Sequence, residues 1–167
     1  MDHRNRVRFV AALFAATMAT PAAAHLSIIR QGPESTGTRL FGDRFGSTLV
    51  AGDFNGDGYD DLATAAVGEN VGGNGNSGNV TINFGSYFGL THVGAVDLDV
   101  SDFGLVPQVN AGFGTAMAVA RLNDDDYDDL IVGAPFEDVN GVLDAGRVYF
   151  YAGGPSGLTP WFHFRQE

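Results

Sequence analysis

Short apolar segments separated by glycine-rich and acidic turns recur along most of the chain. The clearest of these segments lie at 47–52, 62–67, 80–84, 115–120, 130–134 and 148–152. Each is about five residues long, and Gly or Asp ends the Ala-rich segments before a helix could extend beyond a turn or two. The pattern therefore predicts an all-β protein built from short strands.

The chain matches itself when it is shifted by 68 residues, the separation of Phe45-Gly46 from Phe113-Gly114. The register holds without a gap as far as Gly89-Leu90-Thr91, which falls on Gly157-Leu158-Thr159. Each unit then reads strand, acidic loop, strand, glycine-rich loop, strand, glycine turn and a fourth strand, placed at 159–165 in the second unit. Four antiparallel strands per repeat are typical of a propeller blade, which must stack on neighbouring blades to bury its faces.

The motifs within each unit resemble a known repeat. Phe113-Gly114 is followed by Gly133-Ala134-Pro135 with an Asp-rich loop between them, which is similar to the FG-GAP repeat of integrin α-subunit propellers and related bacterial exported proteins. The first unit departs from it by reading Ala65-Ala66-Val67 where Gly-Ala-Pro is expected. The resemblance implies two four-stranded antiparallel blades of a β-propeller, at 41–108 and 109–167. Because it also implies seven blades in a complete propeller, the pair is expected to be a partial propeller, a remnant, or one completed by association.

The first acidic loop, DFNGDGYDD at 53–61, places oxygen-bearing groups at alternate positions. Calcium takes roughly 6–8 oxygen ligands from flexible loops, and Gly56 and Gly58 permit the positive φ values that wrap a chain around an ion. Thr64 stands where an EF-hand would need its bidentate Glu. We predict a calcium site here, and the resemblance implies the same five ligands, whereas a solvated turn without metal is the alternative. The predicted ligands are the side chains of Asp53, Asn55, Asp57 and Asp61 and the backbone carbonyl of Tyr59.

The second acidic loop, RLNDDDYDD at 121–129, keeps four of the five ligand positions but changes the first ligand and both glycines. Arg121 replaces the first Asp, and Asp124 and Asp126 replace the two Gly residues. Either calcium binds here too, or the Arg121 guanidinium partly neutralises the cluster without a metal. The candidate ligands are Asn123, Asp125, Tyr127 and Asp129.

The N-terminal residues have the pattern of an export signal. Three arginines precede an apolar run at 9–19, and Ala22-Ala23-Ala24 provides small residues for cleavage after Ala24. We predict a signal peptide at 1–24 and a lead-in segment at 25–40. No later stretch approaches the ~20 apolar residues of a membrane span. A secreted, periplasmic or cell-surface protein without membrane insertion after cleavage is therefore expected.

The charge and composition exclude several classes of partner. The net charge is −11, and the chain contains neither Lys nor Cys. Such a charge repels nucleic acid and anionic membranes but favours the binding of divalent cations. Without Cys, cohesion must come from burial, supplemented by metal.

Catalytic motifs are scarce, so we expect no catalytic residues and no organic cofactor. The chain has no nucleophile elbow and no thiol, and GNGNSG at 73–78 lacks the strand-helix context of a dinucleotide site. The leading hypothesis is an exported, non-enzymatic, calcium-binding module for extracellular binding or adhesion. The alternatives are accessory repeats of a secreted hydrolase, or a truncated remnant with no independent activity.

The partner of such a module is expected to be an extracellular protein or a glycan. The resemblance implies that a partner binds on the face opposite the calcium loops, here the loops 69–78 and 137–146. Self-association through the edges of the blades is also expected. Three aromatic residues in the last strand either await a neighbouring blade or form a ligand patch: Trp161, Phe162 and Phe164.

Overall fold

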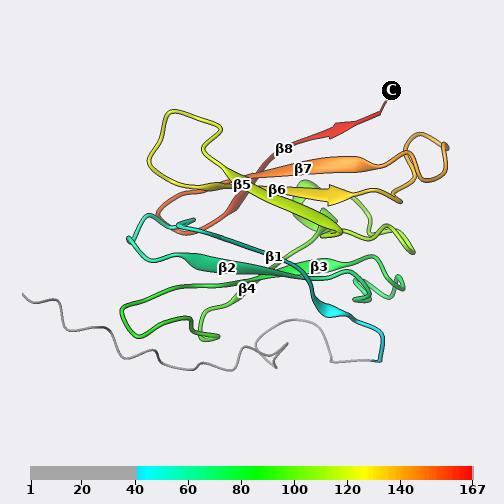
Figure 1. The fold of residues 1–167 in the computed structure, drawn as a ribbon. Coiled ribbons are helices and arrows are strands. Elements are labelled where there is room, and N and C mark those ends of the chain that lie inside the picture. Colours follow the sequence, from blue (N-terminus) through cyan, green and yellow to red (C-terminus); the bar gives the residue numbers. More distant parts are fainter. Residues whose placement is uncertain (1–40, 167) are drawn as a thin grey trace, which may run out of the picture.

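The computed structural model describes residues 41–166, so the predicted signal peptide and lead-in segment lie outside the described residues. Two four-stranded antiparallel sheets stack face to face, as Figure 1 shows. In each sheet the strands follow one another in sequence order. The all-β prediction and the plan of four antiparallel strands per repeat are confirmed, and the two sheets do not close into a ring. The strands of the first sheet are β1 (Phe45–Gly52), β2 (Asp61–Ala66), β3 (Asn79–Asn83) and β4 (Val96–Leu98), and those of the second are β5 (Ala116–Ala120), β6 (Asp129–Ala134), β7 (Arg147–Ala152) and β8 (Thr159–Arg165).

The predicted strands lie within one or two residues of the observed ones, but the 68-residue register breaks at the fourth strand. In the second sheet Phe164 pairs with Val148, whereas in the first sheet Leu98 pairs with Val80. An unbroken shift of 68 residues would pair Val96 with Val80 instead. The turn that precedes β4 is longer than its counterpart, and β4 has 3 residues against 7 in β8.

The core lies between the two sheets. The first sheet contributes small and medium side chains, and the second contributes larger ones. Alternation along each strand directs every second residue to this interface. Burying each large apolar side chain contributes about 1.5–3 kcal/mol. The buried residues of the interface, each no more than 1% exposed, are Ala63, Ala65, Val80 and Ile82 of the first sheet and Leu130, Val132, Tyr149 and Tyr151 of the second.

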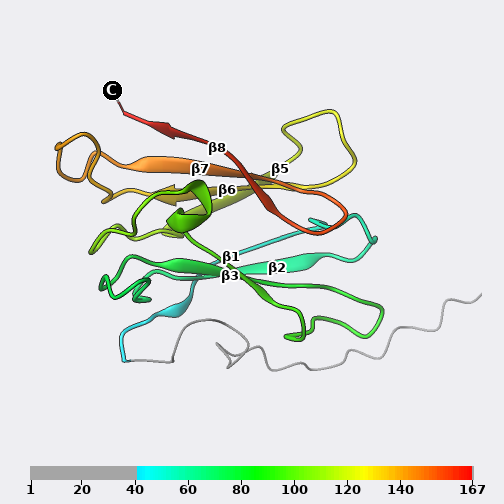
Figure 2. The same cartoon turned by 180° about the vertical axis from the view of Figure 1, so that it is seen from behind.

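A single turn of 3-10 helix, η1 (Val100–Phe103), joins the sheets and packs against the second one, as Figure 2 shows. The ring of Phe103 lies 4.9 Å from that of Tyr149 and 5.0 Å from that of Tyr151, between centroids. The Tyr151 hydroxyl donates to the carbonyl oxygen of Asp99, the N-cap of η1, at 3.0 Å. These contacts fix the connection between the two repeats.

The Phe-Gly motif of the second repeat docks that repeat on the first. Phe113 is fully buried, and its N–H donates to the carbonyl of Ser77 at 2.9 Å. Gly114 has φ +90°, and a Cβ atom there would lie 2.8 Å from the Cβ of Ala65. Gly78 is equally tight, because a Cβ there would lie 2.3 Å from the Phe113 carbonyl oxygen. The motif is therefore a contact between repeats that requires glycine on both sides.

Candidate metal centre

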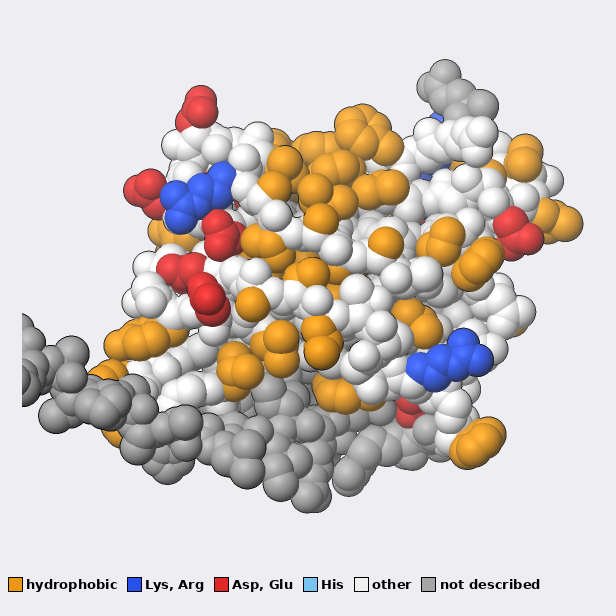
Figure 3. All heavy atoms as spheres, in the orientation of Figure 1, with side chains coloured by type: hydrophobic (Ala, Val, Ile, Leu, Met, Phe, Trp, Pro, Cys, Tyr) orange, Lys and Arg blue, Asp and Glu red, His pale blue; other side chains and the backbone are white. Residues whose placement is uncertain are grey.

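The two acidic loops lie side by side at one end of the stacked sheets. The first joins β1 to β2 and the second joins β5 to β6, and both appear at the left in Figure 1. The Asp128 N–H donates to the Asp53 carbonyl at 3.1 Å, which joins the loops directly. In the space-filling view, charged side chains gather at this end of the molecule (Figure 3).

The first loop curls its side-chain oxygens inward over its own backbone. Asp53 accepts from the N–H groups of Asp57 at 3.1 Å and Gly58 at 2.9 Å. Asn55 Oδ1 accepts from the same Asp57 N–H at 3.0 Å. Asp57 in turn accepts from the Tyr59 N–H at 2.9 Å. Oxygens from Asp53 and Asn55 therefore converge on one point of the loop.

Glycine is required in this loop, as predicted, and for a second reason that the sequence did not reveal. Gly56 and Gly58 have φ values of +73° and +87°. The ring of Tyr127 from the second loop lies over Gly56, so that a Cβ atom there would be 2.5 Å from the ring carbon Cε1. Asp60, which lies between the predicted ligands Tyr59 and Asp61, is exposed.

Asp61 closes the first loop from beneath. It is fully buried, and its two carboxylate oxygens accept from the N–H of Phe54 at 3.0 Å and of Gly85 at 2.8 Å. Desolvation raises the pKa of Asp61; the two amide hydrogen bonds oppose this rise, and the charges of Asp57 and Asp53 add to it. In this conformation Asp61 ties the ends of β1, β2 and β3 together. Its role as a metal ligand stays a prediction.

Within residues 41–166, no three His, Cys, Asp or Glu side chains are arranged to hold a metal ion. In the first loop, both carboxylate oxygens of Asp61 accept from backbone amides. Calcium also accepts amide and carbonyl oxygens, so the set suited to it is Asp53, Asn55 and Asp57 with the Tyr59 carbonyl. The convergence of Asp53 and Asn55 on one amide fits that set of hard oxygen donors.

The second loop repeats this construction except at its first position. Asp129 is buried and accepts from the N–H of Leu122 at 2.7 Å and of Gly153 at 2.9 Å, as Asp61 does in the first loop. Asn123 Oδ1 again accepts from the Asp125 N–H, at 3.1 Å. Calcium binding by Asn123, Asp125, Tyr127 and Asp129 stays a prediction.

Arg121 and Asp128 form a link between the loops that sequence reasoning missed. Arg121 Nε donates to Asp128 Oδ1 at 3.1 Å, and Asp128 Oδ2 accepts from the Asp53 N–H at 3.0 Å. The hydrogen bond and the charge of Asp128 raise the pKa of Arg121. This geometry supports the alternative in which the guanidinium neutralises part of the second cluster. No spacing within the second loop marks Asp128, because its link depends on contact with the first loop.

The opposite end of the sheets carries the loops 69–78 and 137–146, which were predicted to contact a partner. Glu137 at the base of the second loop is 2% exposed, accepts from Arg147 Nε at 2.9 Å, and accepts from the Tyr149 hydroxyl. Both the hydrogen bond and the charge of Glu137 add to the desolvation that raises the pKa of Tyr149. In the first repeat, Asn79 and Thr81 replace Arg147 and Tyr149. The buried ion pair of Glu137 and Arg147 fixes the base of the second loop.

The comparisons with known proteins agree with the geometry. The FG-GAP repeat family matches residues 45–82 and 113–151, one segment in each sheet. The chain is an FG-GAP repeat protein. Both matches begin at a Phe-Gly motif, and the second of these forms the contact between the repeats. The two sheets are therefore propeller-type blades.

Similar proteins carry the same kind of repeat within much longer chains. A phosphatidylinositol-glycan-specific phospholipase D of Mus musculus is 35% identical over 116 residues, which are 68% of this chain and 14% of the relative. Integrin alpha-PS2 of Drosophila melanogaster is 31% identical over 121 residues, 70% of this chain and 8% of the integrin. Integrin alpha-3 of Mus musculus is 31% identical over 128 residues, 73% of this chain and 10% of the relative. The chain thus spans about a seventh or less of the length of these relatives.

Proposed function

We propose that this FG-GAP protein is an exported, non-enzymatic module that binds calcium in its first acidic loop and binds an extracellular protein or glycan, as in adhesion. The main observation in support of calcium binding is the inward curl of the first loop. Side-chain oxygens of Asp53 and Asn55 both accept from the Asp57 N–H there. In the part of the chain that the structure describes, no helix is long and apolar enough to cross a bilayer.

Calcium is expected to stabilise the loop because it offsets the repulsion among converging carboxylates. For a Kd of ~0.1 mM, as in weak extracellular modules, ~1 mM calcium adds roughly 1.4 kcal/mol to the free energy of unfolding. For a domain of this size, that gain corresponds to a rise in Tm of about 3–6 °C.

Thermal unfolding in chelator and in calcium tests the proposal. The wild type is expected to melt at a higher temperature in calcium, and Asp53→Asn is expected to remove the difference. Magnesium at the same concentration is the control, because it demands a small octahedral site and keeps its water. Equal melting temperatures in chelator and calcium would mean that the loop is a turn and binds no metal.

Binding of a partner is assigned to the end of the blades opposite the acidic loops. The glycine-rich loop 137–146 has exposed apolar side chains at its tip, with Val142 at 60% and Leu143 at 76% exposure. Its base is fixed by the buried pair of Glu137 and Arg147. Candidate protein and glycan ligands on an array, compared between the wild type and Leu143→Asp, test this assignment. Loss of a signal in the variant supports it, and signals that are unchanged by the substitution contradict it.

A second candidate function is that of accessory repeats for a hydrolase. The observation that favours it is the 35% identity to a phosphatidylinositol-glycan-specific phospholipase D, which is confined to 14% of that relative. Cleavage of a phosphatidylinositol-glycan-anchored substrate by the purified chain, alone and mixed with a hydrolase from the same host, separates the two functions. Turnover by the chain alone would contradict the non-enzymatic proposal.

Export is tested by the N-terminus of the protein recovered outside the cytoplasm. Mass spectrometry is expected to find His25 as the first residue, because cleavage is predicted after Ala24. Retention of the full-length chain inside the cell would contradict export.

A further inference from the structure

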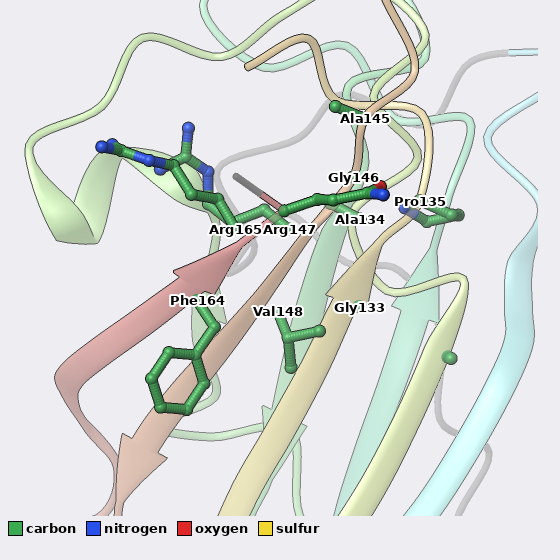
Figure 4. Close-up of a pocket in the computed structure, with 11 residues that line it drawn as sticks. Gly133, Ala134, Pro135, Ala145, Gly146, Arg147, Val148, Phe164 and Arg165 are labelled. Atoms are coloured by element: carbon green, nitrogen blue, oxygen red, sulfur yellow. The ribbon is translucent and has the colours of Figure 1, made fainter. Parts of the chain in front are cut away.

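The second sheet has an open apolar face on the side away from the first sheet. Figure 4 shows Val148 and Phe164 side by side there, and the two are 38% and 62% exposed. In the first sheet the counterpart of Val148 is Val80, which is fully buried because the second sheet covers it. Leu122, 40% exposed, has the same relation to the fully buried Phe54. The same positions are thus buried only where another sheet stacks on them.

A cavity of about 400 Å³ lies on this face, lined by Gly133, Gly146 and Val148 among others. Shifted by 68 residues, these three are Ala65, Gly78 and Val80. Those residues hold the Phe-Gly motif of the second repeat in the first sheet: a Cβ at Gly114 would meet Ala65 at 2.8 Å and Val80 at 3.1 Å, and a Cβ at Gly78 would meet the Phe113 carbonyl oxygen. The cavity therefore has the position and the lining of a Phe-Gly acceptor.

The same chain carries a second Phe-Gly motif in the docking conformation. Gly46 has φ +90°, as does Gly114, and no atom of the described residues lies within 4 Å of a Cβ built on it, its chain neighbours aside. On the same strand Leu49 is 55% exposed, whereas its counterpart Met117 packs against the core. Phe45, Gly46 and Leu49 thus occupy the positions that Phe113, Gly114 and Met117 occupy in the second repeat.

We propose that Phe45-Gly46 and Leu49 of one copy dock in the cavity at Gly133, Gly146 and Val148 of a second copy, which repeats between chains the contact that joins the two repeats within one chain. The inference rests on the propeller-type module of the proposed function but not on calcium. It uses a sheet face and a corner, and it does not use hydrogen bonding along the edge strands.

The hydrogen bonds of the internal contact have counterparts on the two surfaces. Inside the chain the Phe113 N–H donates to the Ser77 carbonyl. The shift of 68 residues turns this pair into the Phe45 N–H of one copy and the Ala145 carbonyl of the other, and Ala145 also lines the cavity. The backbone donor and acceptor that the docking needs are therefore both at the proposed interface.

Charge complementarity favours a second copy over an unrelated repeat. Inside the chain, Asp128 accepts from the N–H of Asp53 in the preceding repeat. The corresponding pair between copies is Asp60 and Arg121. Asp60 is exposed, and the Arg121 side chain is 57% exposed. A cation thus stands where the incoming carboxylate would arrive, at the position where the first loop has an Asp.

The proposed contact is heterologous, because two different surfaces of the chain meet in it. We call the surface at Phe45, Gly46 and Leu49 the donor corner and the surface at Gly133, Gly146 and Val148 the acceptor face. Such contacts build rings or open chains. Light scattering of the wild type over a range of concentrations is expected to show a mass that rises beyond the monomer. Val148→Asp on the acceptor face and Leu49→Asp on the donor corner are each expected to give a monomer.

Mixing the two variants gives the sharpest result. Val148→Asp keeps a donor corner and Leu49→Asp keeps an acceptor face, so an equimolar mixture is expected to form a dimer that cannot grow. Val106→Asp, at a residue that is 78% exposed in the connection after η1, is the matched control and is expected to associate as the wild type does. Circular dichroism and urea unfolding check that each variant folds. Phe164→Arg replaces Val148→Asp if that variant does not fold, and Leu49→Arg replaces Leu49→Asp in the same event.

Two results would overturn the proposal. A wild type that stays monomeric at every concentration excludes the contact. Association abolished by Val148→Asp but unaffected by Leu49→Asp, without dimer formation on mixing, means that two open faces meet symmetrically. Melting curves of the wild type in chelator and in calcium, recorded beside the light scattering, separate this inference from the proposed function. Association together with equal melting temperatures in the two buffers supports the docking and contradicts the metal site. A melting temperature raised by calcium in a wild type that stays monomeric does the reverse.

Discussion

Gly114 and Ala65 meet between the two sheets so closely that a Cβ atom on Gly114 would lie 2.8 Å from that of Ala65. The glycine also has φ +90°, a conformation that L side chains rarely adopt. This one position therefore combines a backbone requirement with a steric one. It explains physically why Gly follows Phe at the start of the second repeat.

Gly114→Ala is expected to destabilise the protein far more than Gly46→Ala. Both positions have φ +90°, so each substitution costs about 1–2 kcal/mol in backbone strain. Only position 114 adds the clash with Ala65, which brings its cost to roughly 3–5 kcal/mol. Urea unfolding of both variants, at a concentration where the wild type is monomeric, measures the difference. Equal losses would show that the sheets do not meet at Gly114.

Asp61→Asn is expected to destabilise the protein whether or not calcium is present. Asp61 satisfies the buried N–H groups of Phe54 and Gly85, and an amide side chain has only one acceptor oxygen for the two. Leaving one buried donor unpaired costs about 1–3 kcal/mol. Asp129→Asn in the second loop is the matched control and should show a similar loss.

Unfolding in chelator and in calcium separates the two roles of Asp61. An equal loss in both buffers assigns Asp61 to the closure of the strand ends. A loss seen only in calcium would contradict this account and make Asp61 a metal ligand alone.

Arg147→Met is expected to cost about 3–5 kcal/mol, because it leaves the buried Glu137 carboxylate without its cation. The double variant Glu137→Gln with Arg147→Met should recover part of that loss, since no charge remains buried. Chemical denaturation of the single and double variants forms the cycle. Additive losses would mean that the two side chains do not interact.

The stability contributed by His163 is expected to fall on acidification. Burial against the aromatic residues and the charge of Arg147 lower the pKa of His163 below its usual 6.5. The unfolded chain therefore takes up the proton first, so this contribution is present above pH 6.5 and is lost as the pH falls through the lower folded value. His163→Phe removes the group while keeping a ring beside Phe103, which lies 5.9 Å away between centroids.

Urea unfolding from pH 7 to pH 5 measures this effect as the difference between the wild type and His163→Phe. The wild type should lose stability relative to the variant as the pH falls. A difference that stays constant with pH would contradict the shift. Comparing the two proteins removes the effects of Asp61 and Asp102, whose raised pKa values act in the opposite direction.

Much of the fold follows from local pattern and internal repetition. The strands, their order and the Phe-Gly motifs are evident because alternation and glycine turns determine them within a few residues. The shift of the fourth strand was not evident, because Leu98 takes the place opposite Val80 only after a longer turn. Such a change of register depends on which apolar side chain reaches the core.

The oxygen ligands of the candidate site could be predicted from the sequence, but the contacts that hold the loop closed could not. Spacing identified Asp53, Asn55 and Asp57, whose oxygens do curl into the loop. The tie made by Asp61 and the link from Asp128 to Asp53 depend on three-dimensional neighbours from other strands and from the second repeat. No spacing within one loop contains that information.

Arg121→Asp is expected to complete the second loop and give it the first-position carboxylate that Asp53 provides in the first. Loss of the guanidinium removes its hydrogen bond to Asp128 and adds the repulsion that calcium offsets. The number of calcium ions bound per chain should rise by one relative to the wild type, as measured by native mass spectrometry. An unchanged number would mean that Asp126, in place of Gly58, prevents the second loop from closing around an ion.

Calorimetric titration of calcium into the metal-free full chain tests the central claim most directly. The account predicts saturable binding in the weak range of extracellular modules, about 0.1–1 mM, which is lost in Asp53→Asn and kept in the surface control Asp138→Asn. Absence of saturable binding in the wild type, or binding that survives Asp53→Asn, would contradict the assignment of the first acidic loop as a calcium site.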